Sequence, residues 1–95
     1  MAEQPRPHHR PVTPGERFFD ALEGGADPYR LSEAAERAVR LDPTRSTWWV
    51  HLGYAQASSG VGSQARRQAQ AERSFRTALE RSPWSAEAMT GLLRL

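Results

Sequence analysis

The chain has 95 residues, of which 38% are hydrophobic, carries a formal net charge of +2 and contains no cysteine. This length suits one small domain, and the lack of cysteine excludes disulfides and thiolate metal sites. All thirteen basic residues are arginine, which we interpret as the codon bias of a GC-rich, bacterial genome. No apolar run approaches the ~20 residues of a membrane span, and the N-terminus lacks the apolar core of a signal peptide. The sequence therefore predicts a soluble, cytoplasmic protein.

Residues 1–13 differ in composition from the rest of the chain. They are rich in proline and arginine and have no apolar periodicity, which predicts a disordered, partly polyproline-like tail. His8 and His9 could ligate a metal, but adjacent side chains on a flexible tail do not converge on one ion. We therefore expect a solvated arm, with no metal and no other cofactor.

Residues 14–43 predict two short helices. Each begins with a capping side chain followed by a proline at the first helical position, at Thr13-Pro14 and at Asp27-Pro28. The first helix should end at Gly24-Gly25, and Asp42-Pro43 should end the second. The apolar stripes of the two helices include Phe18, Phe19, Leu22, Leu31, Ala35 and Ala38.

Residues 44–83 carry the strongest pattern in the chain. Trp49, Leu52 and Gly53 lie at positions i, i+3 and i+4, so they share one face of a helix, for which Ser46 or Thr47 is the expected cap. A second helix and its end are marked by Ala71, Phe75, Ala78 and Pro83. Small residues on a shared face allow two amphipathic helices to approach closely and form a hairpin.

This pattern resembles the tetratricopeptide repeat, a helix–turn–helix unit marked by W-x2-L-G, A-x3-F, x2-A and a closing proline. The resemblance implies an all-α fold of antiparallel helix pairs, stacked as a short right-handed α-solenoid. It implies a degenerate repeat at 14–43, a second repeat at 44–83 and a terminal capping helix at 84–95. The chain departs from the family where Gln56 replaces the motif's tyrosine, and where Phe19 and Leu31 replace small residues.

The second repeat is longer than the family's unit. Pro43 and Pro83 are 40 residues apart, about six more than the ~34 residues of one repeat. The extra residues fall within residues 61–70, where Gly62-Ser63 offers a new N-cap and the residues that follow favour helix. We expect the second helix of this repeat to be lengthened at its start by nearly two turns.

The resemblance also implies where a ligand would bind. In such repeats the first helix of each pair lines a concave groove that receives a peptide or an extended protein segment. Mapped by motif position, the groove residues are Glu16, Asp20, Glu23, Thr47, Val50, His51, Tyr54, Ser58, Thr90 and Arg94. Tyr54 is the best candidate for a ligand-contacting aromatic, because its hydroxyl can bond a peptide backbone. The implied function is a protein–protein interaction module, an adaptor or scaffold.

A second hypothesis uses the basic segment Arg66–Arg81, which could bind nucleic acid or an acidic partner surface. Its arginines alternate with Glu72 and Glu80, and no aromatic platform for stacking bases is evident, which argues against nucleic acid. A third hypothesis, an enzyme, lacks any nucleophile–base pair, phosphate loop or metal-ligand spacing. We therefore predict no catalytic activity.

Four ring-bearing residues carry separate expectations. Trp49 should belong to the core, whereas Trp48, about 100° further round the helix, either packs against the preceding helix or is partly exposed. Trp84 should cover the end of the stack, with an aromatic interface anchor as the alternative. His51 is expected to be a polar residue of the surface or groove.

The last predicted helix, residues 86–95, has no following helix in the sequence. Met89 and Leu92 are expected to pack back on the second hairpin, while Leu93 and Leu95 point partly elsewhere. Such an apolar patch favours a two-fold homodimer through this helix. A monomer whose leucines fold back fully is the alternative.

Overall fold

A computed structural model describes residues 14–95. Within this range it contains five α-helices and no strand, so the predicted all-α fold is confirmed. The predictions for residues 1–13, including those for His8 and His9, lie outside the described residues. The helices are α1 (Pro14–Glu23), α2 (Pro28–Leu41), α3 (Ser46–Ser58), α4 (Gln64–Arg81) and α5 (Ala86–Arg94). None of them is long and apolar enough to cross a membrane.

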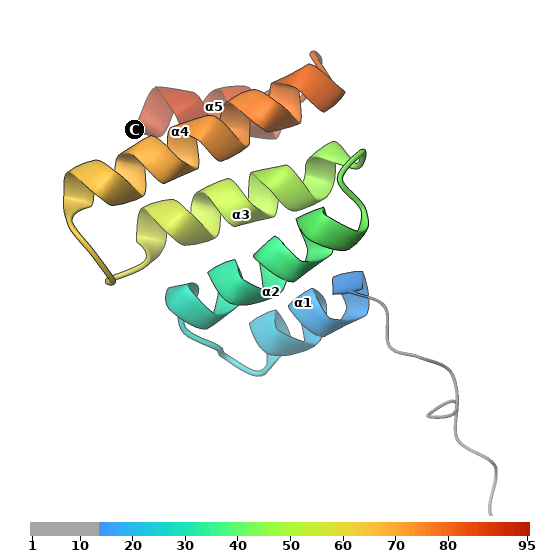
Figure 1. The fold of residues 1–95 in the computed structure, drawn as a ribbon, viewed down its shortest axis with the longest axis vertical. Helices are drawn as coiled ribbons and strands as arrows, with labels where there is room; N and C mark the ends of the chain where they lie inside the picture. The colour runs from blue at the N-terminus through green and yellow to red at the C-terminus, as the bar shows by residue number, and fades with distance from the viewer. Residues whose placement is uncertain (1–13) are drawn as a thin grey trace, which may run out of the picture.

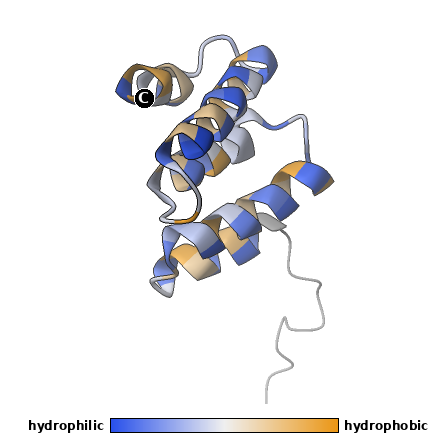
Figure 2. Ribbon diagram, turned by 60° about the vertical axis from the view of Figure 1, so that its left-hand side comes forward, coloured by the Kyte–Doolittle hydropathy of each residue, from blue (hydrophilic) through white to orange (hydrophobic). Residues whose placement is uncertain are grey.

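The five helices are stacked in chain order, and short turns reverse the chain between them (Figure 1). Each helix packs on the next one in the sequence, and α5 also touches α3. Hydrophobic and hydrophilic segments alternate along the helices (Figure 2), as expected when one face of each helix is buried. The winding of this stack into a right-handed solenoid stays a prediction.

Side chains cap three of the helices. The Asp27 carboxylate accepts a hydrogen bond from the backbone N–H of Arg30, and Ser63 accepts one from that of Arg66. Ser85 caps α5 in the same way. The expected caps of α2 and α4 are thus confirmed. The cap expected for α3 is wrong: α3 begins at Ser46, and the extended residue before it is Arg45, whose side chain makes no capping bond.

Two hydrophobic cores lie on either side of α3. The N-terminal core joins α1, α2 and α3 through Phe18, Ala34, Ala35, Ala38, Val39, Trp48 and Leu52. The C-terminal core joins α3, α4 and α5 through Val50, Ala71, Phe75, Ala78 and Ala88. Because α3 contributes side chains to both cores, it is the central helix of the protein. Its sequence contains no acidic residue, lysine or arginine, as burial on several sides requires.

The two adjacent tryptophans of α3 are buried to different degrees. Trp48 is the buried one, at 7% exposure, and it packs against the preceding helices, which was one of its two predicted placements. Trp49 is only partly buried, between the two cores. Its indole N–H donates to the carbonyl of Pro43 at 2.9 Å. Trp49 thus packs against both cores, as expected of a core residue, but one edge of its ring lies at the α2–α3 turn, where its N–H finds an acceptor.

The α2–α3 turn is also bonded to α4. The Nε of Arg81 donates to the same Pro43 carbonyl at 2.9 Å. This carbonyl oxygen, with two lone pairs, thus accepts one bond from α3 and one from α4. The two bonds connect the end of the first helix pair to the far end of the second.

Phe75 is fully buried between two glycines. A Cβ added at Gly53 on α3 would lie 2.6 Å from Cε1 of the ring, and a Cβ at Gly91 on α5 would also overlap the ring. The close approach predicted at Gly53 is confirmed. The role of Gly91 was missed, because the motif register assigns the glycine position of α5 to Leu93.

The inward face of α5 therefore consists of Ala88 and Gly91, with Leu92 and Leu95 partly buried beside them. Met89 is exposed, so the expectation that it packs back on the second hairpin was wrong. Leu93 is 88% exposed and Trp84 is 85% exposed. Trp84 does not cover the stack as expected; it lies on the surface of the α4–α5 turn.

Candidate functional site

Most of the predicted groove residues lie at the surface of α1, α3 and α5. Val50 is the exception: it is buried in the C-terminal core, because α5 packs over this part of α3. The remaining residues do not form one continuous site. Two recesses on either side of the N-terminal half of α3 collect some of them, and others lie apart.

The larger recess, here called the α1–α3 recess, has a volume of about 430 Å³. It brings together three predicted groove residues, Glu16 and Asp20 from α1 and Thr47 from α3. Glu16 and Asp20 are four residues apart, which places both carboxylates on the same face of α1. The complete lining is Glu16, Phe19, Asp20, Arg45, Thr47 and Trp48.

Aromatic rings support this recess from beneath. Phe19 is 45% exposed, and its centroid lies 5.6 Å from that of Phe18 and 5.9 Å from that of Trp48. Phe18 and Trp48 are buried, and both contact the His51 ring, at 4.7 and 5.9 Å. The exposed ring of Phe19 therefore rests on a packed aromatic base, which limits its movement.

The charge around the α1–α3 recess is mainly negative. Glu16 and Asp20 border it on one side, and Arg45 is the basic residue in its lining. The Nε of Arg45 lies 3.3 Å from the carboxylate of Asp42, so part of this positive charge is compensated within the turn. Exposed pairs of this kind are weak, but they bias where the guanidinium lies.

The smaller recess, here called the α3–α5 recess, has a volume of about 160 Å³. Thr47 lines it as well, so the two recesses meet at this residue. Its lining consists of Ser46, Thr47, Val50, His51, Ser85 and Glu87. Val50 contributes only the small part of its side chain that the core leaves accessible.

His51 lies between the aromatic base and the α3–α5 recess. Burial lowers the pKa of its imidazole, and the negative charge of Glu87 acts in the opposite direction. The neutral ring is therefore favoured near neutral pH, which agrees with its packing against Phe18. His51 is a half-buried member of the aromatic cluster, and a smaller part of it faces the recess.

The hydroxyl of Tyr54, the candidate ligand-contacting aromatic, is already engaged within the protein. Its O–H donates to the backbone carbonyl of Glu87 at 3.1 Å, and its ring lies edge-on to Phe75 at 5.0 Å. Tyr54 thus attaches α5 to α3. Contact with a peptide backbone would use the remaining acceptor capacity of the hydroxyl oxygen.

The other predicted groove residues line neither recess. They are Glu23 at the end of α1, Ser58 at the end of α3, and Thr90 and Arg94 on α5, and all four are exposed. The motif mapping assumes equal helix lengths and even spacing between repeats. α1 has 10 residues and α5 has 9, so the outer helices border only part of the 13-residue α3.

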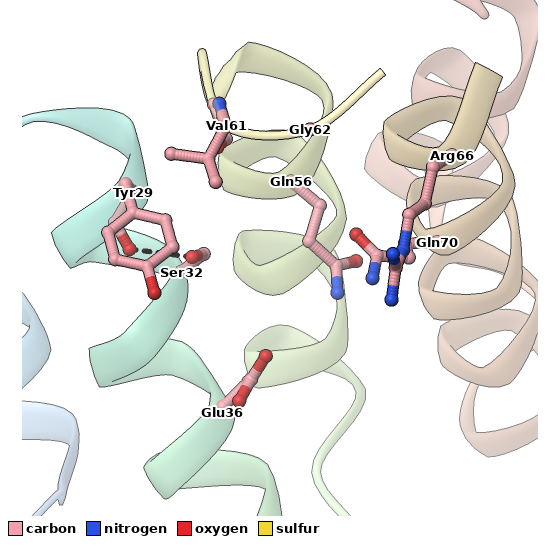
Figure 3. Close-up of a pocket in the computed structure, with 9 residues that line it drawn as sticks. Tyr29, Ser32, Glu36, Gln56, Val61, Gly62, Arg66 and Gln70 are labelled. Atoms are coloured by element: carbon pink, nitrogen blue, oxygen red, sulfur yellow. Dashed lines mark hydrogen bonds between the residues drawn. The ribbon is translucent and has the colours of Figure 1, made fainter. Parts of the chain in front are cut away.

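A third hollow, here called the back pocket, was not predicted as a site. It has a volume of about 320 Å³ and lies between α2 and α4, over the C-terminal half of α3 (Figure 3). Figure 3 shows Tyr29 and Glu36 on one side and Arg66 and Gln70 on the other. The full lining is Tyr29, Ser32, Glu36, Gln56, Ser59, Val61, Gly62, Arg66 and Gln70.

Residues 61–70, within which the insertion was predicted, supply one wall of the back pocket. Gly62 has a φ of +86°, a left-handed conformation that favours glycine, and the chain then enters α4 at Gln64. The six-residue surplus was thus the sequence signal that could have located this pocket. Several of its polar groups already have partners, because Ser74 donates to Gln56 at 2.6 Å and Ser32 donates to the carbonyl of Tyr29.

Several arginines of the basic segment are engaged within the protein. Arg67 donates from Nη1 to the carbonyl of Ser59 at the end of α3, and Arg76 pairs with Glu72 at 2.9 Å. Arg81 holds the α2–α3 turn, as described above. These arginines of α4 are therefore already engaged in contacts within the protein. They lend no support to α4 as a surface dedicated to nucleic acid or an acidic partner.

Within the part of the chain that the structure describes, no group of three or more metal-ligating side chains could hold an ion. Comparison of the chain with protein-family models, curated proteins and solved structures gives no match. The fold defines the class, a small all-α protein of stacked helices with two adjoining recesses on the α1, α3 and α5 side. Any narrower assignment, including the tetratricopeptide repeat, is a proposal.

Proposed function

We propose that this protein is a tetratricopeptide-like interaction module that binds an extended segment of a protein or peptide across α3. The observation that carries the proposal is the position of Thr47, which lines both recesses. A chain passing over Thr47 could place one side chain in the α1–α3 recess and a later one in the α3–α5 recess. A cytoplasmic adaptor or scaffold is the corresponding role.

The packing of the second hairpin supports the repeat interpretation. Ala71, Phe75 and Ala78 are nearly or fully buried, and the glycine of the W-x2-L-G pattern, Gly53, contacts the Phe75 ring. These are the positions at which the family's motif places small and large residues. The motif therefore corresponds to a real close contact between α3 and α4.

The test is a selection of twelve-residue random peptides on the full chain, followed by fluorescence anisotropy with a labelled selected peptide. Thr47→Trp adds bulk where the recesses meet, and we expect it to abolish or strongly weaken binding. Gln68→Trp is the matched control, because Gln68 is exposed on α4, away from both recesses. If no peptide is selected, or if both variants bind like the parent, the proposal is wrong.

A further inference from the structure

The composition of the α1–α3 recess indicates which side chain it would accept. We propose that it selects a basic residue of the bound segment, with arginine preferred to lysine. This inference rests on the peptide-binding function proposed above, and it specifies the ligand chemistry of one recess. It follows from three features of the recess: the exposed ring of Phe19, the nearby carboxylates, and an arginine, Arg45, whose charge is partly balanced by Asp42.

The exposed part of the Phe19 ring provides an apolar surface for a cation. Phe19 is held by Phe18 and Trp48, with ring centroids 5.6 and 5.9 Å away. A guanidinium over an aromatic face is attracted by the ring's quadrupole, and its planar shape also stacks on the ring. A lysine ammonium gains the first of these interactions but lacks the planar group needed for the second.

The carboxylates add a charge preference. Asp20 lines the recess on the same face of α1 as Glu16, so both can contribute negative potential to a side chain lying on Phe19. Arg45 opposes this potential, but its guanidinium lies beside Asp42. The recess is thus lined by two acidic residues and one basic residue, and the basic one is already paired with Asp42.

This combination disfavours other ligands. An acidic side chain would be repelled by Asp20 and would gain nothing from the negative face of the Phe19 ring. A purely apolar side chain would cover the ring, but it would also displace water from the carboxylates without replacing those hydrogen bonds. An arginine side chain can both cover the ring and keep hydrogen bonds at the carboxylates, because its guanidinium can lie over the ring while its N–H groups point toward a carboxylate.

A pair of small probes tests the charge preference directly. The ¹⁵N-labelled full chain is titrated with acetyl-Ala-Arg-Ala-amide and, separately, with acetyl-Ala-citrulline-Ala-amide. Citrulline has nearly the shape of arginine but no charge. We expect the arginine peptide to shift the backbone resonances of Phe19 and Asp20 and the indole N–H of Trp48. It should bind about fivefold more tightly than the citrulline peptide.

Two variants localise the effect. Asp20→Asn keeps the shape of an exposed side chain and removes one negative charge, and we expect about threefold weaker binding of the arginine peptide. Glu33→Gln is the matched control: it removes one negative charge from an exposed site on α2 that does not line the recess. It should leave the affinity unchanged.

The outcomes separate this inference from the proposed function. Equal affinity for the arginine and citrulline peptides, or no effect of Asp20→Asn, overturns the preference for a basic side chain. If library peptides are still selected and Thr47→Trp still abolishes their binding, the proposed peptide-binding function stands without the preference for arginine. If no library peptide binds in a Thr47-dependent way, the peptide-binding function itself is wrong.

Discussion

The two hairpins of this protein place a bulky and a small residue on opposite helices. In the second hairpin, the small Gly53 on α3 faces the large Phe75 on α4. In the first hairpin, alignment as the proposed repeat, with the six surplus residues of the second left out, puts the large Phe19 where the second has Gly53. It puts Ala35 where the second has Phe75, because both stand eight residues before their prolines. The large aromatic residue is thus on the first helix of the first hairpin but on the second helix of the second hairpin.

This exchange has a consequence at the surface. Phe75 is enclosed by two glycines and fills the C-terminal core, so none of its ring is available to a ligand. Phe19 lies on α1 at the rim of the N-terminal core, and nearly half of its surface is accessible. Phe19, at a position where the proposed repeat has a small residue, therefore supplies the aromatic surface of the candidate site. The following predictions test the contrast between these two rings.

The largest effect is expected for Phe75→Ala. Removing a fully buried phenylalanine loses its transfer free energy and leaves a cavity, which costs about 3–5 kcal/mol. Urea denaturation monitored by circular dichroism measures the change in the free energy of unfolding. A variant that unfolds at the parent's midpoint would show that Phe75 does not organise the C-terminal core.

Gly53→Ala should have the next largest effect. Its new Cβ would lie 2.6 Å from the Phe75 ring, and overpacking of this kind costs about 1–3 kcal/mol. The better helix propensity of alanine offsets up to ~1 kcal/mol, so we expect a net loss in unfolding free energy of about 1–2 kcal/mol. Gly60→Ala is the control, since a Cβ there meets nothing within 4 Å. Equal stabilities of the two variants would refute the close contact.

Phe19→Ala should destabilise the protein much less than Phe75→Ala. Because about half of the ring is already exposed, its removal should lower the unfolding free energy by about 1 kcal/mol. The same urea experiment measures this value. A loss as large as that of Phe75→Ala would mean that Phe19 is a core residue, and the proposed contrast between the two rings would fail.

We expect His51 to make the free energy of unfolding weakly dependent on pH. Burial lowers its folded-state pKa below the unfolded value of 6.5, so the unfolded chain takes up the proton first as the pH falls. The associated stability is fully present above about pH 6.5 and is lost as the pH falls through the folded-state pKa. Unfolding midpoints measured between about pH 7 and 5 should show this loss, and His51→Gln should reduce it. An identical slope in the variant would exclude His51 as the source.

The last prediction concerns the oligomeric state, for which we expect the smallest change in free energy. Leu93 and Trp84 are almost fully exposed, and a second copy of the chain could cover them through the predicted two-fold contact of α5. Sedimentation equilibrium at rising concentration should show a dimer that Leu93→Glu removes. A monomeric mass for both chains at the highest concentration would leave the alternative, a monomer with exposed Leu93.

The sequence by itself determined the helices. Proline and glycine positions, together with capping side chains such as Asp27 and Ser63, predicted where helices begin and end, because these are local effects of backbone geometry. The resemblance to the repeat motif predicted the all-α class, and small residues such as Gly53 on a shared face predicted the close approach of α3 and α4. That surplus residues relative to the proposed repeat lengthen the start of α4 stays a prediction.

Only the tertiary structure decided which faces meet. Helical periodicity does not say which neighbour covers a given side, so Trp48 and not Trp49 is the more buried tryptophan of α3. Val50 and Tyr54 were assigned to a groove, but α5 packs over α3 and turns them toward the C-terminal core and the Glu87 carbonyl. The recesses likewise depend on how far α1 and α5 extend along α3, a property of packing between helices that no single segment of sequence specifies.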